Sequence, residues 1–207
     1  MLQKTPGSFA GNANGPLSST TIVGVSGDIG SFSEKAASGW IAENEVRDTK
    51  LEYLIEIENV LAALTKGSIG VGVFPIFNNS IGIIDPAIEA MSKYNFTIVD
   101  KIPLLVEHCL LVRTGVSKEQ IDTITSQQPA IDQCERRLHR YWRHTKIDPY
   151  ADTAKAARDL AEGVLPETTA VIGSLKNSKV YGLDVLERPF QDDAENMTVF
   201  LVARQRR

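Results

Sequence analysis

Two places where a helix is expected to begin could bind an anion. Ser31, Phe32 and Ser33 follow a glycine-bearing turn and open one Ala-rich stretch, and Thr153 and Ala154 open another. The first backbone N–H groups of a helix have no partner within it, so they can hold a carboxylate. The same residues could instead only cap their helices, as Ser does in the pattern SxxE.

Amide and hydroxyl side chains elsewhere could orient a small polar ligand. Asn78, Asn79 and Ser80 follow an apolar run, and an amide there could donate a hydrogen bond to a ligand hydroxyl without supplying a proton. The alternatives are that Asn78 and Asn79 form a turn, and that Thr198, in an apolar stretch, is only a strand former. His108 lies within an apolar run, which is typical of a core histidine.

Composition and spacing argue against several kinds of site. The 207 residues include 22 Lys and Arg against 26 Asp and Glu, so the chain lacks the positive excess that nucleic-acid binding requires. No Cys/His grouping has the spacing of zinc ligands, and the glycines between Gly24 and Gly30 do not follow GxGxxG. The charged segment 135–143 is interpreted as a solvated helix face. We therefore expect no metal, no cofactor and no nucleic-acid partner.

The chain has the features of a cytoplasmic protein. Its most apolar run, over 102–112, is interrupted by a proline and two polar residues, so no membrane span is expected. Residues 1–19 lack the apolar region of a secretory signal and are expected to be a disordered leader. Cys109 and Cys134 are interpreted as free thiols of a reducing compartment.

Strand-like and helical patterns alternate along the chain, which predicts an α/β fold with sheets covered on both faces. The second half repeats the alternation and closes on two extended segments, LDVLERPF and MTVFLVARQ. In the first half we expect a strand from Thr21, a helix over 52–64, a buried strand ending at Pro75, a helix over 87–93 and two strands divided by Pro103. In the second half we expect a helix over 129–143, a polar turn, a helix over 153–163, a strand over 169–174 and a helix through Tyr181.

Six ordered segments resemble the catalytic domain of prephenate dehydratases, the enzymes that convert prephenate to phenylpyruvate. The resemblance implies a two-lobed, periplasmic-binding-protein-like (type 2) fold with the active site in the cleft between the lobes. Any one segment alone would be a weak signal, but six in order are a strong one. They are GDIGSFSEKAA at 27–37, PIFNNSIG at 75–82, SQQPAIDQC at 126–134, DTAKAA at 152–157, YGLDVL at 181–186 and QDDAENMTVF at 191–200.

The resemblance covers about residues 20–204, which we expect to form one catalytic domain. The first lobe is expected to comprise about 20–103 and 185–204, and the second about 104–184. We expect no regulatory ACT domain and therefore no phenylalanine feedback by that route. The family's habit of dimerising implies a homodimer.

The chain departs from the dehydratase pattern at three places. Dehydratases usually carry Glu-Asn-Ser after Pro-Ile, whereas FNNS stands at 77–80, with one extra residue and no carboxylate. They usually end in Thr-Arg-Phe, whereas Val199 replaces the arginine here. The usual Ser-His-Pro-Gln is SQQP at 126–129, although Ser126 and Gln133 keep their places.

These departures resemble the prephenate decarboxylases of secondary metabolism. That likeness implies removal of CO2 with protonation of the ring, giving dihydro-4-hydroxyphenylpyruvate for a secondary metabolite. A leaving hydroxide needs a proton, and Asn78 in place of an acid would orient the hydroxyl without supplying one. The alternatives are a prephenate dehydratase making phenylpyruvate for phenylalanine, and a non-catalytic module that binds a small anion.

The resemblance also implies the residues that meet prephenate, the expected small-molecule partner. Apolar residues near the ring carboxylate would withhold solvent from it. The catalytic positions are Asn78, Asn79, Ser80 and Thr198, and the substrate contacts are Ser31, Phe32, Ser33, Ser126, Gln133, Thr153, Ala154, Val199 and Phe200.

Overall fold

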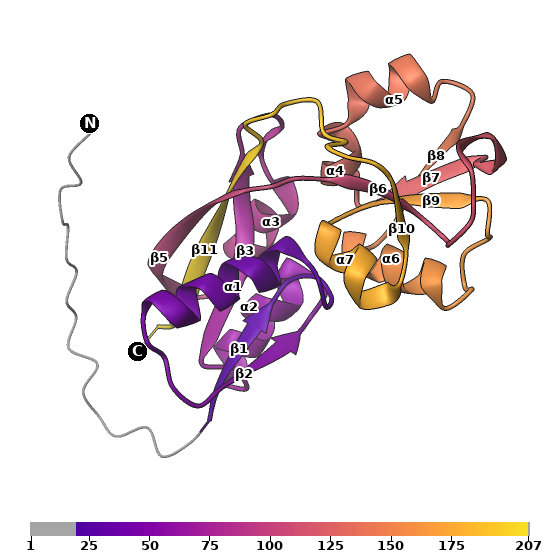
Figure 1. Cartoon of the computed structure of the whole chain (residues 1–207). Coiled ribbons are helices and arrows are strands. Elements are labelled where there is room, and N and C mark those ends of the chain that lie inside the picture. Colours follow the sequence, from indigo (N-terminus) through magenta and orange to yellow (C-terminus); the bar gives the residue numbers. More distant parts are fainter. Residues whose placement is uncertain (1–19, 207) are drawn as a thin grey trace, which may run out of the picture.

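The computed structural model describes residues 20–206, and the leader expected over 1–19 lies outside the described residues. The chain builds two β-sheets side by side, each with helices on both faces (Figure 1). This is the α/β fold that the alternating pattern predicts. None of the helices within 20–206 has the length and apolar character needed to cross a bilayer.

The first sheet has the strand order β2-β1-β3-β11-β5, with the short β4 paired to β3. β1 runs parallel to β2 and β3, and β11 runs antiparallel to both β3 and β5. Helix α1 packs on one face, and α2 and α3 pack on the other. The bounds are β1 Thr21–Val25, α1 Phe32–Glu43, β2 Thr49–Tyr53, α2 Ile57–Lys66, β3 Val71–Asn78, β4 Gly82–Ile83, α3 Asp85–Lys93, β5 Phe96–Leu105 and β11 Met197–Gln205.

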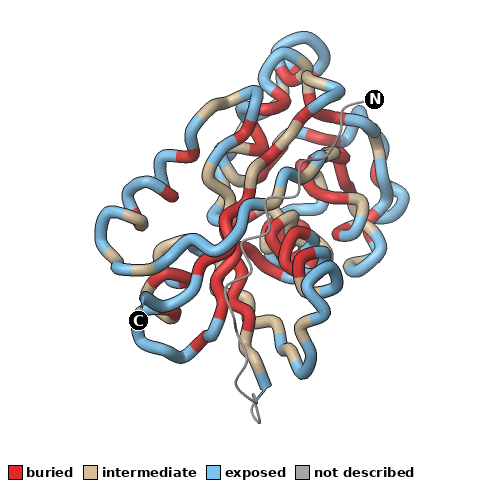
Figure 2. The backbone as a smooth tube through the Cα atoms, turned by 90° about the vertical axis from the view of Figure 1, so that its left-hand side faces the viewer, coloured by how far each residue is buried: buried red, intermediate tan, exposed pale blue. Residues whose placement is uncertain are grey.

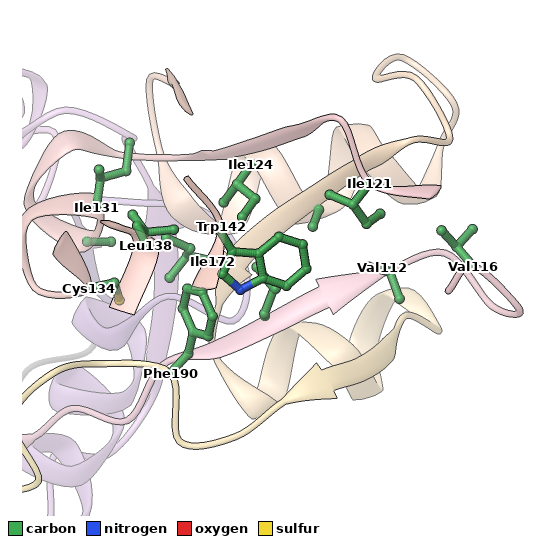
Figure 3. Packing of buried hydrophobic residues seen from close by; sticks show 13 residues of the cluster. Val112, Val116, Ile121, Ile124, Ile131, Cys134, Leu138, Trp142, Ile172 and Phe190 are labelled. Carbon is green, nitrogen blue, oxygen red and sulfur yellow. The ribbon is translucent and has the colours of Figure 1, made fainter. Parts of the chain in front are cut away.

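The second sheet has the order β10-β6-β9-β7-β8, and the 3-10 turn η1 precedes β7. Trp142 and Phe190 fill one face of this sheet beneath α4 and α5 (Figure 3), and α6 and α7 cover the other face. The bounds are β6 Cys109–Val112, η1 Lys118–Gln120, β7 Thr123–Ser126, α4 Gln128–Asp132, α5 Glu135–Tyr141, β8 Lys146–Pro149, α6 Thr153–Ala161, β9 Thr169–Gly173, α7 Leu175–Tyr181 and β10 Asp184–Glu187.

Two crossings join the sheets, one between β5 and β6 and one between β10 and β11 (Figure 1). The lobe boundaries expected at 103/104 and 184/185 fall inside β5 and β10, because strand pairing continues to Leu105 in the first sheet and to Glu187 in the second. Figure 2 shows buried backbone running through the centre of both sheets. Cys109 and Cys134 are free and buried.

Several expected elements are wrong in their bounds. The strand expected to end at Pro75 continues to Asn78 as β3, because β11 and β4 pair with its last residues. The helix expected over 52–64 begins only at Ile57, because residues 49–53 pair with β1 as β2. Pro103 lies within the single strand β5 and does not divide two strands. Because β5 is an edge strand, the N–H that proline lacks would face no partner strand. The polar turn after Trp142 contains β8, which pairs with β7.

The helix expected over 129–143 is two helices, broken after Asp132. Asp192, from the distant segment before β11, causes the break. Its N–H donates to the Gln133 carbonyl, and its carboxylate accepts hydrogen bonds from the N–H groups of Arg136 and Arg137 at the start of α5. A carboxylate at a helix N-terminus is favourable both as a cap and against the helix dipole.

Candidate active site

A cavity of about 470 Å³ lies between the two sheets. Segments 26–33, 55–58 and 84–89 line it from the first sheet, and segments 127–133 and 149–153 line it from the second. The wall also includes Thr198 and Phe200 of β11, Val106 and His108 between β5 and β6, Pro75 of β3 and Asn177 of α7. A concave site of this size between two lobes suits a small molecule.

The cavity brings together about half of the residues expected to meet the substrate. Thr198 is the one expected catalytic position that lines it, and Asn78, Asn79, Ser80, Ser126, Ala154 and Val199 do not line it. The expected substrate contacts that line it are Ser31, Phe32, Ser33, Gln133, Thr153 and Phe200. Their contacts with a ligand stay predictions.

The start of α1 forms one wall. Ser31 caps the helix by accepting a hydrogen bond from the Glu34 N–H at 3.2 Å, and Ser33 bonds Ser26 at 2.9 Å. The Phe32 ring meets the His108 ring edge-on, with centroids 5.4 Å apart. Ser31 therefore caps its helix, as the alternative interpretation holds, and it also lies at the cavity.

The first sheet's glycine-bearing turn is held against α7 of the second lobe. Ser174 Oγ donates to the Gly30 carbonyl at 2.8 Å, and Asn177 Nδ2 donates to the Ile29 carbonyl at 3.3 Å. Gly30 has a φ of +89°, and a Cβ there would lie 2.3 Å from Asn177 Nδ2. A Cβ at Gly30 would therefore displace the Asn177 side chain from this contact, and the positive φ also favours glycine.

The start of α6 forms the opposite wall. Asp152 is its N-cap and accepts the Lys155 N–H at 2.8 Å. Thr153 lines the cavity, and its hydroxyl lies 3.0 Å from the hydroxyl of Ser126, which donates to the Ile172 carbonyl. Ser126 thus fixes Thr153 from behind and lies outside the cavity itself.

A chain of buried side chains fixes the Thr198 hydroxyl. Asn78 Nδ2 donates to Thr198 Oγ1 at 2.9 Å and to Asn196 Oδ1 at 2.7 Å, and Asn196 Nδ2 donates to Gln133 Oε1 at 2.7 Å. His108 Nε2 lies 2.9 Å from the same Gln133 oxygen. Because the Thr198 oxygen accepts from Asn78, its own O–H is left to donate to a ligand.

The FNNS segment, which is expected to supply catalytic side chains, does not line the cavity, and its contact with a substrate stays a prediction. Asn78 is fully buried, its Nδ2 donates within the protein, and its Oδ1 accepts from the N–H groups of Ser80 and Ile81. Asn79 is exposed and bonds the backbone of Glu195 and Met197. The segment therefore fastens β3 to the start of β11, and it does not face the cavity.

The β3–β11 pairing also changes register at this segment. Val199 pairs with Phe77 and Phe200 with Pro75, so one extra residue of β3 lies between the two pairs. Such a β-bulge accommodates the one extra residue by which the chain departs from the dehydratase pattern. Phe77 is 41% exposed and lies outside the cavity lining.

His108 is neutral in this setting. Burial lowers its pKa to about 4, although the hydrogen bond with Gln133 works in the opposite direction. Since the Gln133 oxygen accepts from Nε2, the proton sits on Nε2 and Nδ1 is an acceptor. His108 is thus a buried histidine, as its apolar run indicates, and it lies at the cavity wall.

Asp152 is a cavity residue that is not among the expected substrate contacts, although it begins the DTAKAA segment. It is 4% exposed and lines the cavity. Burial raises the pKa of its carboxyl, and the nearby Asp28 carboxylate adds to the rise, against the lowering effect of N–H donors from Lys155 and Asp28. The pattern of Asp before Thr at a helix start predicts only an N-cap.

The charges around the cavity are acidic. Within residues 20–206 the cavity lining includes Glu56, Glu58, Glu89 and Asp152 and contains no lysine or arginine. An anion bound there would therefore rely on helix N-termini and hydroxyl groups. The described residues hold no group of three or more His, Cys, Asp or Glu side chains that could bind a metal ion.

The fold and the cavity define a class of protein, a two-lobed α/β fold of the type 2 periplasmic-binding-protein kind with a cavity between the lobes. A periplasmic substrate-binding protein of an ABC transporter from Coxiella burnetii has this fold, with a TM-score of 0.53 at 14% identity over 90% of this chain and 85% of that one. The prephenate dehydratase of Arthrobacter aurescens in complex with L-Phe is similar with a TM-score of 0.76 at 20% identity, over 90% of this chain and 60% of that one.

The family is shown by sequence. The family model for prephenate dehydratase matches residues 23–207, so the chain belongs to the prephenate dehydratase family. It is 32% identical over 184 residues to arogenate dehydratase/prephenate dehydratase 2 of Arabidopsis thaliana, covering 87% of this chain and 45% of that protein. It is 30% identical over 181 residues to the bifunctional chorismate mutase/prephenate dehydratase of Escherichia coli K12, covering 85% and 45%. The chain spans about half the length of these curated relatives.

Proposed function

We propose that this chain is a carbon–oxygen lyase that converts prephenate to phenylpyruvate, releasing CO2 and water. The proposal rests on membership of the prephenate dehydratase family and on relatives whose names include prephenate and arogenate dehydratase activity. Prephenate is the proposed substrate, and the pathway is aromatic amino acid biosynthesis.

One observation favours dehydration over the decarboxylation that the sequence predicts. Decarboxylation is expected because the FNNS segment lacks the carboxylate of the dehydratase pattern. Phe77 and Asn78 both lie outside the cavity lining, so a side chain at either position could not deliver a proton to a ligand there without rearrangement of β3. The missing carboxylate is therefore no evidence that the cavity lacks an acid.

In the proposed complex the Thr198 O–H donates to the substrate, because Asn78 holds its oxygen as an acceptor. The starts of α1 and α6 receive the substrate carboxylates through their free N–H groups. Phe32 and Phe200 exclude water from the ring and its carboxylate. The side-chain oxygen of Gln133 already accepts hydrogen bonds from His108 and Asn196. Gln133 therefore positions the two segments that join the sheets against the ligand.

Non-aromatising decarboxylation, as in secondary metabolism, is the second candidate. The observation that favours it is the lack of lysine and arginine in the cavity lining within residues 20–206, together with Val199 at the position of the family's arginine. A carboxylate with few charge partners is destabilised relative to water, which promotes loss of CO2. The expected homodimer and the binding-only alternative also stay open to test.

Steady-state turnover of prephenate separates these candidates. Phenylpyruvate has a strong enolate absorbance in alkali that dihydro-4-hydroxyphenylpyruvate lacks. Enzyme-dependent formation of phenylpyruvate, above the spontaneous acid-catalysed rate without enzyme, is expected. Release of CO2 without that absorbance would replace the proposal by decarboxylation, and tight binding without turnover would replace it by the binding module.

A further inference from the structure

We propose that Asp152 is the general acid that protonates the leaving hydroxyl of the substrate. This inference rests on the proposed dehydratase activity and adds a catalytic residue to it. Asp152 is the cavity-lining carboxyl that is almost fully buried, at 4% exposure, whereas Glu56, Glu58 and Glu89 lie at less buried positions.

The two carboxyl oxygens of Asp152 differ in their hydrogen bonds within the described residues. The N–H groups of Lys155, at 2.8 Å, and Asp28, at 3.2 Å, both donate to Oδ1. Oδ2 is therefore the oxygen that can carry a proton. Oδ2 is directed at Gly27, another cavity-lining residue, because a Cβ built on Gly27 would lie 3.0 Å from it. We therefore place that proton within reach of a bound substrate.

The charges that face Asp152 favour its protonated form. Asp28, from the turn after β1, is the near carboxylate, and burial and this neighbour both raise the pKa of Asp152. Burial, together with the Asp28 and Asp152 carboxylates, raises the pKa of Tyr181 on α7 to about 12, so Tyr181 stays neutral. The basic groups nearby are already in ion pairs, Arg158 with Asp28, Lys155 with Asp159 and Lys176 with Glu34.

Substrate binding acts in the same direction. Prephenate is a dianion, and no lysine or arginine of the described cavity lining neutralises it. A second negative charge close to a carboxyl disfavours ionisation of that carboxyl. The ligand that needs the proton therefore raises the pKa of Asp152 further.

The proposed step balances with a single proton. The bond between the ring and its carboxylate breaks, CO2 leaves, and the electron pair passes through the diene to the carbon bearing the hydroxyl. That carbon–oxygen bond breaks, and the oxygen takes the proton of Asp152 and leaves as water. Prephenate dianion plus one proton gives phenylpyruvate monoanion, CO2 and water, and solvent returns the proton to Asp152.

The test separates an acid from an N-cap. Asn and Ser cap helices as well as Asp does but carry no acidic proton, so Asp152→Asn and Asp152→Ser should keep α6 intact. Both variants should lose about 100- to 10,000-fold in kcat/KM for phenylpyruvate formation, the usual contribution of a general acid, with a nearly unchanged melting temperature. Wild-type kcat/KM should fall as pH rises past the pKa of Asp152, and the variants should lack that fall.

Asp159→Asn is the matched control, because Asp159 lies on the same helix, is equally buried and is not in the cavity lining. It should lower the melting temperature and keep the wild-type pH profile. If wild type makes phenylpyruvate while Asp152→Asn and Asp152→Ser keep the wild-type kcat/KM or pH profile, Asp152 is only a cap. The acid role then fails, and the proposed dehydration stands. If wild type releases CO2 but retains the ring hydroxyl, the proposed dehydration fails and the acid role fails with it.

Discussion

Replacing Asn78 by Ala should destabilise the protein far more than replacing its neighbour Asn79 by Ala. Asn78 is fully buried and donates to Asn196, also fully buried, and to Thr198, which is 5% exposed. Its removal leaves two buried oxygens without a donor. Each unsatisfied group costs about 1–3 kcal/mol, so the expected loss in unfolding free energy is about 2–6 kcal/mol. That is a large share of the 5–15 kcal/mol typical of a folded domain.

Asn79 offers the control, because it is exposed and makes two comparable hydrogen bonds, at 2.7 and 2.8 Å, that water can replace. Asn79→Ala should cost less than about 1 kcal/mol. Urea unfolding monitored by tryptophan fluorescence measures both values. The folded fraction of Asn78→Ala should also turn over more slowly, since Thr198 loses the donor that orients it. Equal unfolding free energies for the two variants would refute the idea that a buried polar chain holds the site.

Thr198→Val should keep the packing of β11 and lower kcat/KM by about 1–3 kcal/mol in transition-state free energy, whereas Thr198→Ser should retain most of it, as steady-state kinetics on prephenate would show. Ser126→Ala should act through Thr153 and lower kcat/KM by a smaller amount than Thr198→Val; an effect as large as that of Thr198→Val would place Ser126 at the substrate. The unfolding free energy should fall as pH decreases from about 6.5 to about 4, because His108 takes up a proton in the unfolded chain but stays neutral when buried. His108→Gln should remove about 3 kcal/mol of that pH dependence, as urea unfolding at several pH values would show.

Local patterns in the sequence predict much of the fold. Alternating strands and helices gave the α/β class, and the start of α1 at Ser31 and that of α6 at Thr153 fall where capping residues precede Ala-rich stretches. The errors arise where a distant segment decides. The break between α4 and α5 depends on Asp192, some sixty residues away, and β2 forms because β1 lies beside it.

The cavity lining can be predicted only in part, for the same reason. Thr198, Gln133 and the helix starts could be assigned by motif. Asn78 shares its motif with the site, but its side chain points into the seam between β3 and β11, which no local pattern reveals. Asp152 could be recognised only as a cap, because its position in the cavity depends on how the second lobe meets the turn after β1.

The central claim is that this chain aromatises prephenate, and proton NMR of the product tests it most directly. Prephenate incubated with the protein near neutral pH, beside a control without protein, should give the aromatic proton signals of phenylpyruvate at a rate proportional to protein concentration. Signals of a non-aromatic ring that keeps the carbinol proton next to the hydroxyl, formed with loss of CO2, would contradict the claim.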